Sequence, residues 1–240
     1  SAHGARLLII LAFVVVAYWP SLDVPFVFDD FHNIVNNPGV HAERWTDLAA
    51  PFTDERGVRN RPLGKFTFAL NHLAGGLDPR PYHVVNIAIH AVNAALLYLL
   101  VLALTQAPRS PPRLARNAAF FAFGVALIWA LHPVNTQAIT YIVQRLASLA
   151  ALFYLAGLLL FVAWRLGRLR TSLAWTGIAA AFGLGFLTKE HTVTLPAALI
   201  LIDVIFFTGW RRRHTIAVAV IVVAAIPLLT VYGHATLDFL

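Results

Sequence analysis

The sequence predicts an all-α polytopic membrane protein with about seven transmembrane helices and one large extracytoplasmic loop. Of its 240 residues, 59% are hydrophobic and 12% are charged, and this charged share is about half that of a typical soluble domain. The mean hydropathy is +0.73. One water-soluble core cannot contain so many apolar side chains, so a globular soluble enzyme is excluded.

Seven apolar runs approach the length of about 20 residues that spans a bilayer. The first is short and lacks a small-residue cleavage site, so we expect a retained signal anchor rather than a cleaved signal peptide. The third and fifth are also short, and we expect their outer ends to lie below the membrane surface. The runs cover residues 7–19, 84–104, 115–131, 146–164, 172–187, 192–208 and 215–232.

The charged residues predict a cytoplasmic amino terminus and an extracytoplasmic first loop. In this orientation the inner loops hold ten arginines, and ten of the eleven acidic residues lie outside. Short arginine-rich loops are typical of the cytoplasmic side of a membrane protein. The net charge of +7 therefore reflects arginines in cytoplasmic loops and not a nucleic-acid-binding surface. We expect no nucleic-acid partner. The chain has no cysteine, which excludes disulfides, thiolate metal sites and a cysteine nucleophile.

The one large segment outside the apolar runs is the first outer loop, residues 20–81. Its short aromatic and apolar stretches, such as Phe66-x-Phe68-x-Leu70, predict short helices that lie on the membrane surface. They do not predict a separate folded unit. We therefore expect residues 1–240 to form a single membrane domain.

Two adjacent carboxylates, Asp29 and Asp30, follow the first apolar run in the sequence Phe26-Val-Phe-Asp-Asp. Aromatic neighbours at a low-dielectric boundary raise the pKa of a carboxyl group, which suits a general base. Adjacent side chains point in different directions on a helix or a strand, so at most one of the two is expected to do chemistry. The alternative is a solvated acid pair in a loop turn.

A polar stripe begins the second apolar run. His83, Asn86, His90 and Asn93 are spaced i, i+3, i+7 and i+10, which places them on one helix face. The stripe descends about 15 Å from the outer surface, where polar side chains face protein or a wet cavity rather than lipid. A cavity and helix–helix hydrogen bonds are both open interpretations. Two histidines seven residues apart are a weak metal signal, because the helical zinc pattern is i, i+4.

The third apolar run ends in Leu131-His-Pro-Val. Pro133 is expected to break the helix at the outer membrane level and to leave backbone groups in need of partners. From there to Trp164 the chain is too long for one perpendicular span, so we expect an interfacial helix before the fourth span. Arg145 follows it, and either extends to lipid head groups or binds an anion.

A tight outer hairpin, Thr188-Lys-Glu-His-Thr192, joins the fifth and sixth runs. Lys189 and Glu190 either pair with each other at the surface or belong to a site. Asp203 lies deep in the sixth run, and intramembrane acids are usually functional. Since residues 211–213 are three arginines that could neutralise it, we expect a structural role for Asp203.

The outer-face features lie in four separate segments, yet the topology places them all at one membrane surface. Together they suggest a cavity with a base and cations for an anionic lipid head group. No G-x-S-x-G, Walker A or H-E-x-x-H motif is present.

In combination, these motifs resemble the transmembrane and tetratricopeptide-repeat O-mannosyltransferases, in their bacterial branch. Gln144-Arg-Leu-Ala stands where the animal members have Gly-Arg-Ala-Asp, so an acid of the animal pattern is missing. The resemblance covers about residues 18–205. Its motifs, in chain order, are Phe26-Val-Phe-Asp-Asp with Ile34 and Asn36, Arg61-Pro-Leu, Tyr82-His-x-x-Asn-x-x-x-His90, Leu131-His-Pro-Val, Arg145 and Lys189-Glu190.

The resemblance implies a type-C glycosyltransferase fold in the inner membrane. Such an enzyme takes a sugar, here mannose by analogy, from a polyprenyl-phosphate carrier and transfers it to protein hydroxyls at the outer face. It implies Asp29 as the catalytic base, with Asp30 orienting it or the acceptor. No protein metal site is implied, and a divalent cation stays open as a cofactor. The implied substrate-binding residues are Arg61, His83, Asn86, His90, His132, Arg145, Lys189 and Glu190.

Two other functions stay open. The family's carboxy-terminal repeat domain is expected to be absent from this chain, which favours a non-catalytic structural subunit beside other membrane proteins. A lipid or ion transporter is a third class, but no inverted repeat is visible in the sequence.

Overall fold

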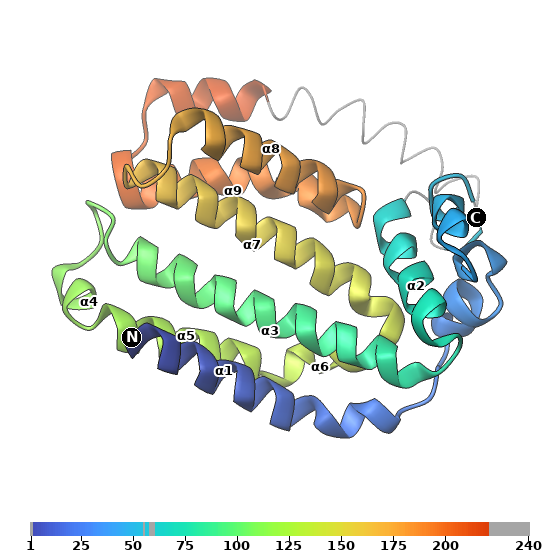
Figure 1. The fold of residues 1–240 in the computed structure, drawn as a ribbon. Coiled ribbons are helices and arrows are strands. Elements are labelled where there is room, and N and C mark those ends of the chain that lie inside the picture. The colour runs from blue at the N-terminus through green and yellow to red at the C-terminus, as the bar shows by residue number, and fades with distance from the viewer. Residues whose placement is uncertain (1, 55, 58–60, 221–240) are drawn as a thin grey trace.

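The computed structural model describes residues 2–54, 56–57 and 61–220. Helices are the only regular secondary structure in these residues, and they form one bundle with a cap of short helices at one end (Figure 1). The α-helices are α1 (Ala2–Tyr18), α2 (Pro62–Gly75), α3 (Pro79–Leu104), α4 (Pro112–Arg116), α5 (Ala118–Ala130), α6 (Thr136–Thr140), α7 (Arg145–Arg165), α8 (Thr171–Phe186) and α9 (Leu195–Ile202).

Among the described residues, four helical segments are long and apolar enough to cross a membrane, and a fifth crossing results if the bent pair of α5 and Pro133–Thr140 is one span. The helix α8 is apolar but shorter. The chain is therefore a helical membrane protein, and the count of seven spans stays a prediction. The four segments are Ala2–Asp23, Pro79–Leu104, Ile142–Arg165 and Glu190–Thr208.

Six of the seven predicted apolar runs coincide with helices α1, α3, α5, α7, α8 and α9. The seventh, residues 215–232, lies mostly outside the described residues, which are helical from 212 to 220. The predicted break at Pro133 is confirmed, because the chain bends by 50° between α5 and the segment Pro133–Thr140. The physical reason is that the proline ring cannot continue the hydrogen-bonded helix.

The helix α3 lies at the centre of the bundle and packs against α1, α5 and α7 (Figure 1). Small side chains line its contacts with α1 and α5, among them Ala94 and Ala126, both fully buried. Small residues allow the backbones of membrane helices to approach closely. On the other side, α7, α8 and α9 share a second apolar core that includes Phe161 and Leu195.

The first loop folds onto one end of the bundle. Short helices form there as expected, including η4 (Trp45–Phe52) and α2. A buried cluster joins Ile34 and Phe68 to Tyr82 of α3 and Ile142 before α7. The loop is therefore anchored to the ends of two central helices, and this anchoring positions the candidate site.

Candidate functional site

Most of the predicted site residues gather at the capped end of the bundle. The connections run from the first loop to the segment before α7, from α7 to α2 and α3, and from α2 to the hairpin between α8 and α9. The backbone N–H of Leu63, in α2, donates to the carbonyl of Leu187 at 3.2 Å. Segments that are far apart in the sequence are therefore in direct contact at this end of the bundle.

Asp30 is fully buried, and both of its carboxylate oxygens accept backbone hydrogen bonds. The N–H of Val143 donates to Oδ1 at 2.8 Å, and the N–H of Val27 donates to Oδ2 at 3.0 Å. Burial raises the pKa of the Asp30 carboxyl, although these two bonds favour the charged form. Asp30 therefore fastens the first loop to the segment before α7.

Asp29, by contrast, is exposed. Its backbone N–H donates to the hydroxyl of Tyr141 at 2.8 Å, and its carbonyl accepts from Asn33 Nδ2 at 2.8 Å. The expectation that adjacent carboxylates point apart is confirmed, since one is buried and the other faces solvent. Of the two carboxylates, only that of Asp29 is open to solvent.

An open cavity of about 560 Å³ lies between the first loop and residues 133–141. Asp29 is next to it through Phe28, which precedes Asp29, and Tyr141, which accepts the Asp29 N–H; both line the cavity. Its walls include Val27 and Phe28 on one side and Pro133 and Tyr141 on the other. Phe28 is 85% exposed and has a φ of 45°, a left-handed conformation that is strained for a residue with a bulky side chain. Such strain persists where the surrounding structure enforces it, often at functional sites. The strained residue directly precedes Asp29.

Tyr141 lines this cavity and contacts Asp29, but it is not among the site residues predicted from the sequence. Burial raises the pKa of its hydroxyl, and the charges of Asp29 and Asp30 raise it further. The phenol is therefore a stable neutral hydrogen-bonding group beside Asp29. Its position four residues before Arg145 was the available sequence signal.

The polar stripe on α3 does not line a cavity, because all four side chains are buried and bonded to backbone carbonyls. His83 Nε2 donates to the carbonyl of Val24 at 2.9 Å. Asn93 Nδ2 donates to the carbonyl of Ser148 at 2.8 Å. The wet-cavity interpretation is therefore wrong for this conformation, and the interpretation as interhelical hydrogen bonds is confirmed.

Two residues of the stripe, His90 and Asn86, satisfy carbonyls near the break between α5 and α7. His90 Nε2 donates to the carbonyl of Ala130 at 2.9 Å, where α5 ends. Asn86 Nδ2 donates to the carbonyls of Ile139 and Ile142 at 3.2 and 3.3 Å. Carbonyls at a helix end need such partners when no water is present. His90 and Asn86 thus compensate for the break that Pro133 introduces, whereas His83 and Asn93 bond carbonyls elsewhere.

Arg145 is fully buried, so it neither extends to head groups nor meets a lipid phosphate from solvent. Its Nε donates to Asn86 Oδ1 at 2.7 Å, and its Nη1 donates to Asn71 Oδ1 at 2.6 Å. Nη2 donates to the carbonyl of Tyr82 at 2.9 Å. The guanidinium also lies 4.7 Å from the centre of the Phe68 ring. Arg145 therefore joins α2, α3 and α7, a role that differs from both sequence-based interpretations.

The hairpin residues take part in a contact that the sequence did not predict. Glu190 Oε1 pairs with Arg61 Nη2 at 2.7 Å, and this ion pair connects α2 to the hairpin. Burial lowers the pKa of the Lys189 ammonium, and the nearby Arg61 lowers it further. His132 is exposed and caps the turn at Pro133 by accepting the N–H of Val134 at 3.2 Å. Arg61 and Lys189 are therefore the predicted cations that lie near the surface.

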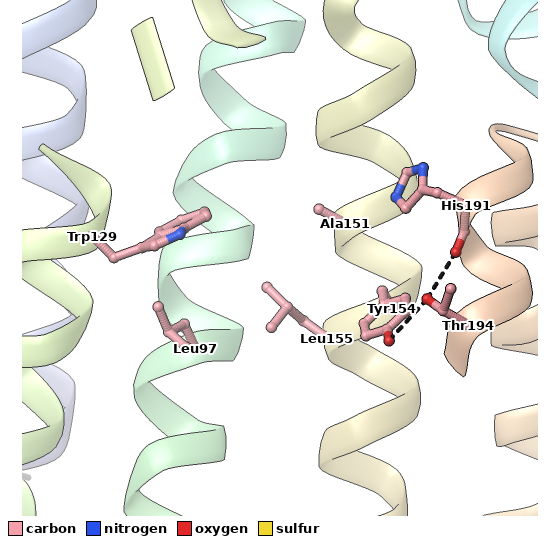
Figure 2. A pocket seen from close by; sticks show the side chains of 7 residues that line it. All are labelled: Leu97, Trp129, Ala151, Tyr154, Leu155, His191 and Thr194. Atoms are coloured by element: carbon pink, nitrogen blue, oxygen red, sulfur yellow. Dashed lines mark hydrogen bonds between the residues drawn. The ribbon is translucent and has the colours of Figure 1, made fainter. Parts of the chain in front are cut away.

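A second cavity, of about 310 Å³, opens between α3, α5, α7 and the short helix η7 (Glu190–Thr194) (Figure 2). Its walls are mainly apolar and include Leu97, Trp129 and Leu155. Its polar edge is formed by Tyr154 and Thr194, whose hydroxyl oxygens are 3.2 Å apart. The cavity therefore extends the surface at the hairpin into the apolar part of the bundle.

Within the described residues, no group of three or more His, Cys, Asp or Glu side chains is arranged to hold a metal ion. Asp30, the more buried of the two adjacent carboxylates, has both oxygens bonded to backbone N–H groups. The geometry of the site thus offers the exposed Asp29 carboxylate, the Glu190 carboxylate paired with Arg61, the half-buried cations Arg61 and Lys189, and two cavities.

Comparison with known proteins finds protein O-mannosyl-transferases of several animals as relatives. The chain is 30% identical over 224 residues to the mouse protein O-mannosyl-transferase TMTC3, which is 88% of this chain and 23% of that protein. It is 31% identical over 215 residues to human TMTC3, 84% of this chain and 22% of that protein. It is 33% identical over 174 residues to the Caenorhabditis elegans protein O-mannosyl-transferase F38B6.6, 67% of this chain and 24% of that protein.

The chain thus spans about a quarter of the length of the curated relatives it matches. No family profile and no solved structure matches it.

Proposed function

Because this chain is a relative of the TMTC protein O-mannosyl-transferases, we propose that it is the membrane module of a glycosyltransferase. It transfers a sugar, mannose by analogy with these relatives, from a polyprenyl-phosphate carrier to a protein hydroxyl. The observation that carries the proposal is the position of Asp29, exposed beside the open cavity between the first loop and residues 133–141.

In the proposed mechanism Asp29 is the general base. The acceptor hydroxyl enters the cavity and gives its proton to the Asp29 carboxylate while its oxygen attacks the anomeric carbon of the sugar. The bond from that carbon to the carrier phosphate breaks, and the polyprenyl phosphate leaves. Asp30 positions Asp29, since it connects Val27, which lines the cavity, to Val143, two residues after Tyr141.

The cations proposed for the leaving phosphate are Arg61 and Lys189, with Glu190 holding Arg61 in place. Arg145 and the stripe residues His83, Asn86 and His90 support the site from inside the bundle. The apolar cavity of Figure 2 lies next to the hairpin and has walls suited to a polyprenyl chain. On this proposal the phosphate of the carrier contacts Arg61 and Lys189, and its polyprenyl chain lies in the apolar cavity next to the hairpin.

We also propose that the protein lies in the plasma membrane of a bacterium, with the Asp29 face outside. Support comes from the motif resemblance and from the positions of the loops. The arginine-containing loops next to α4 and between α7 and α8 lie at the end of the bundle opposite α2 (Figure 1). This separation matches the positive-inside distribution.

The test is sugar transfer by the chain reconstituted in liposomes with a radiolabelled polyprenyl-phosphate mannose and a hydroxyl-bearing acceptor protein. Asp29→Asn should reduce transfer by about 10²–10⁴-fold, the usual loss for a general base. Glu43→Gln is the matched control, because Glu43 is an exposed acid of the same loop and should leave transfer unchanged. Equal transfer by the wild type and Asp29→Asn would refute the assignment of the base.

A second candidate is a non-catalytic structural subunit of a larger membrane complex that keeps this fold. The observation in its favour is the closed α3 stripe, in which each of the four buried side chains donates to a backbone carbonyl within the bundle. On this proposal the wild type transfers no sugar, and Asp29→Asn copurifies with the same membrane partners as the wild type. The transfer assay therefore separates the two candidates.

A further inference from the structure

A charged groove lies at the end of the bundle opposite Asp29. It is an open cavity of about 550 Å³ between α7, α8, α9 and the helical residues 212–220. Neither the transferase site nor its proposed mechanism uses this groove. Its charged, histidine and tryptophan lining residues are Trp164, Arg165, Trp175, Asp203, Arg213 and His214.

The charged part of this groove is organised around Asp203, which is buried. Asp203 Oδ2 accepts hydrogen bonds from Thr208 Oγ1 at 2.8 Å and His214 Nε2 at 2.9 Å. Arg213 Nη2 lies 3.1 Å from the same oxygen, and Arg165 pairs with Oδ1. The expected neutralisation of Asp203 by the arginine run is confirmed for Arg213, and the structure adds Arg165 from α7.

The cluster holds more positive than negative charge. Two guanidinium groups face one carboxylate, so one positive charge is left over when His214 is neutral. The Arg213 side chain is 55% exposed. Of its five N–H donors, one on Nη2 is directed at Asp203, and Nε lies 3.4 Å from His214 Nε2, which itself donates to Asp203. Donors are therefore left to face the groove.

The local backbone supports a built site rather than a chance surface cluster. Residues Asp203–Thr208 form a π-helix, and Gly209 follows with a φ of 68°. This wide turn brings the Thr208 hydroxyl back onto Asp203. Such π-helical turns interrupt α-helices mostly at functional positions.

The other half of the groove is apolar. From Asp203 the groove continues to Pro196, about 10 Å along α9, and Phe161 and Leu199 also line it. Trp164 and Trp175 stand at its charged end with ring centres 5.5 Å apart. Tryptophan at this position is typical of the level of lipid head groups. The groove is therefore cationic at one end and apolar along its length.

We propose that this groove binds an anionic phospholipid. The phosphate contacts Arg213 and Arg165, and an acyl chain lies along Phe161 and Leu199. A basic pocket between membrane helices on the arginine-rich side is the kind of site that binds such head groups. A free phosphate ion would use only the cationic end, whereas the apolar half fits a lipid. The site is independent of sugar transfer.

The test is native mass spectrometry of the purified chain in detergent, titrated with phosphatidylglycerol or with phosphatidylcholine of the same acyl chains. We expect tighter binding of phosphatidylglycerol. Arg213→Gln should weaken that binding about fivefold, since one arginine near a membrane surface contributes about that factor toward anionic lipid. Arg113→Gln, in the exposed helix α4 at the same end, is the charge-matched control and should have no effect.

Two further measurements keep the proposal open to refutation if Arg213→Gln folds poorly. Asp203→Asn removes the negative charge and should leave phosphatidylglycerol binding equal or tighter; weaker binding would mean that the cluster only holds the helices together. Inorganic phosphate at millimolar concentration should not displace the lipid, and displacement would assign the site to a free anion. Equal binding of the two lipids, or equal losses in Arg213→Gln and Arg113→Gln, would also overturn the proposal.

Discussion

Arg145 provides the sharpest test of how this end of the bundle is held together. Replacing it with alanine removes a fully buried cation whose partners lie on α2 and α3. The carbonyls of Thr67 and Tyr82 lie within helices and keep their helical partners. The amide oxygens of Asn71 and Asn86, however, would be left buried without a donor.

The magnitude follows from these partners. A buried acceptor without its donor costs about 1–3 kcal/mol, and there are two of them. The neighbouring Asp30, whose charge Arg145 offsets, would also lose its nearby cation, and breaking such a buried arrangement costs about 3–5 kcal/mol in total. We therefore expect Arg145→Ala to lower the free energy of unfolding by about 4 kcal/mol. For a chain of this size that is a fall of about 10 °C in the apparent Tm.

The assay is thermal unfolding in detergent, followed by circular dichroism and paired with binding of the polyprenyl-phosphate carrier. Arg145→Lys should lie between wild type and Arg145→Ala, because an ammonium cannot reach partners arranged around a planar fork. Arg116→Ala, at an exposed position, should leave the Tm unchanged. If Arg145→Ala kept the wild-type Tm and lost only carrier binding, Arg145 would be a phosphate ligand and our account of its burial would be refuted.

Two further predictions concern the same region. Burial raises the pKa of Asp30 in the folded state, so the folded protein binds this proton more tightly than the unfolded chain does. Protonation of Asp30 therefore stabilises the fold. The stabilisation is complete below the unfolded pKa of about 3.9 and is lost as the pH rises through the folded pKa. The apparent Tm of the wild type relative to Asp30→Asn should therefore fall between pH 4 and pH 7, and a difference independent of pH would contradict it. Gly64→Ala should destabilise the protein by about 1–3 kcal/mol, because its Cβ would lie 1.8 Å from Leu146 Cδ2. Gly124→Ala, with open space at its Cβ, should have little effect on the denaturation midpoint. If Gly64→Ala and Gly124→Ala shifted this midpoint equally, the result would argue against close packing of α2 on α7.

Part of this architecture is local and could be predicted from the sequence. The apolar runs identify six of the described helices, because a helix that crosses a membrane must satisfy its backbone internally and present apolar side chains. The break at Pro133 follows from the missing N–H and the proline ring. The divergence of Asp29 and Asp30 follows from the geometry of adjacent residues.

The roles of the polar side chains were decided by tertiary contacts. Periodicity placed His83, Asn86 and His90 on one face of α3. The same spacing is compatible both with a cavity and with hydrogen bonds between packed helices. The face is closed because carbonyls from other segments, 40 to 59 residues away in the chain, lie against it.

Arg145 and Asp203 show the same limit. The side-chain partners of Arg145 are 59 to 78 residues away in the sequence, and Arg165 reaches Asp203 from α7. Whether a charged residue faces a substrate, a lipid or the interior depends on which helices pack around it. That choice is determined by the folded bundle, because the free energy of a buried charge depends on its partners and not on its position in the chain.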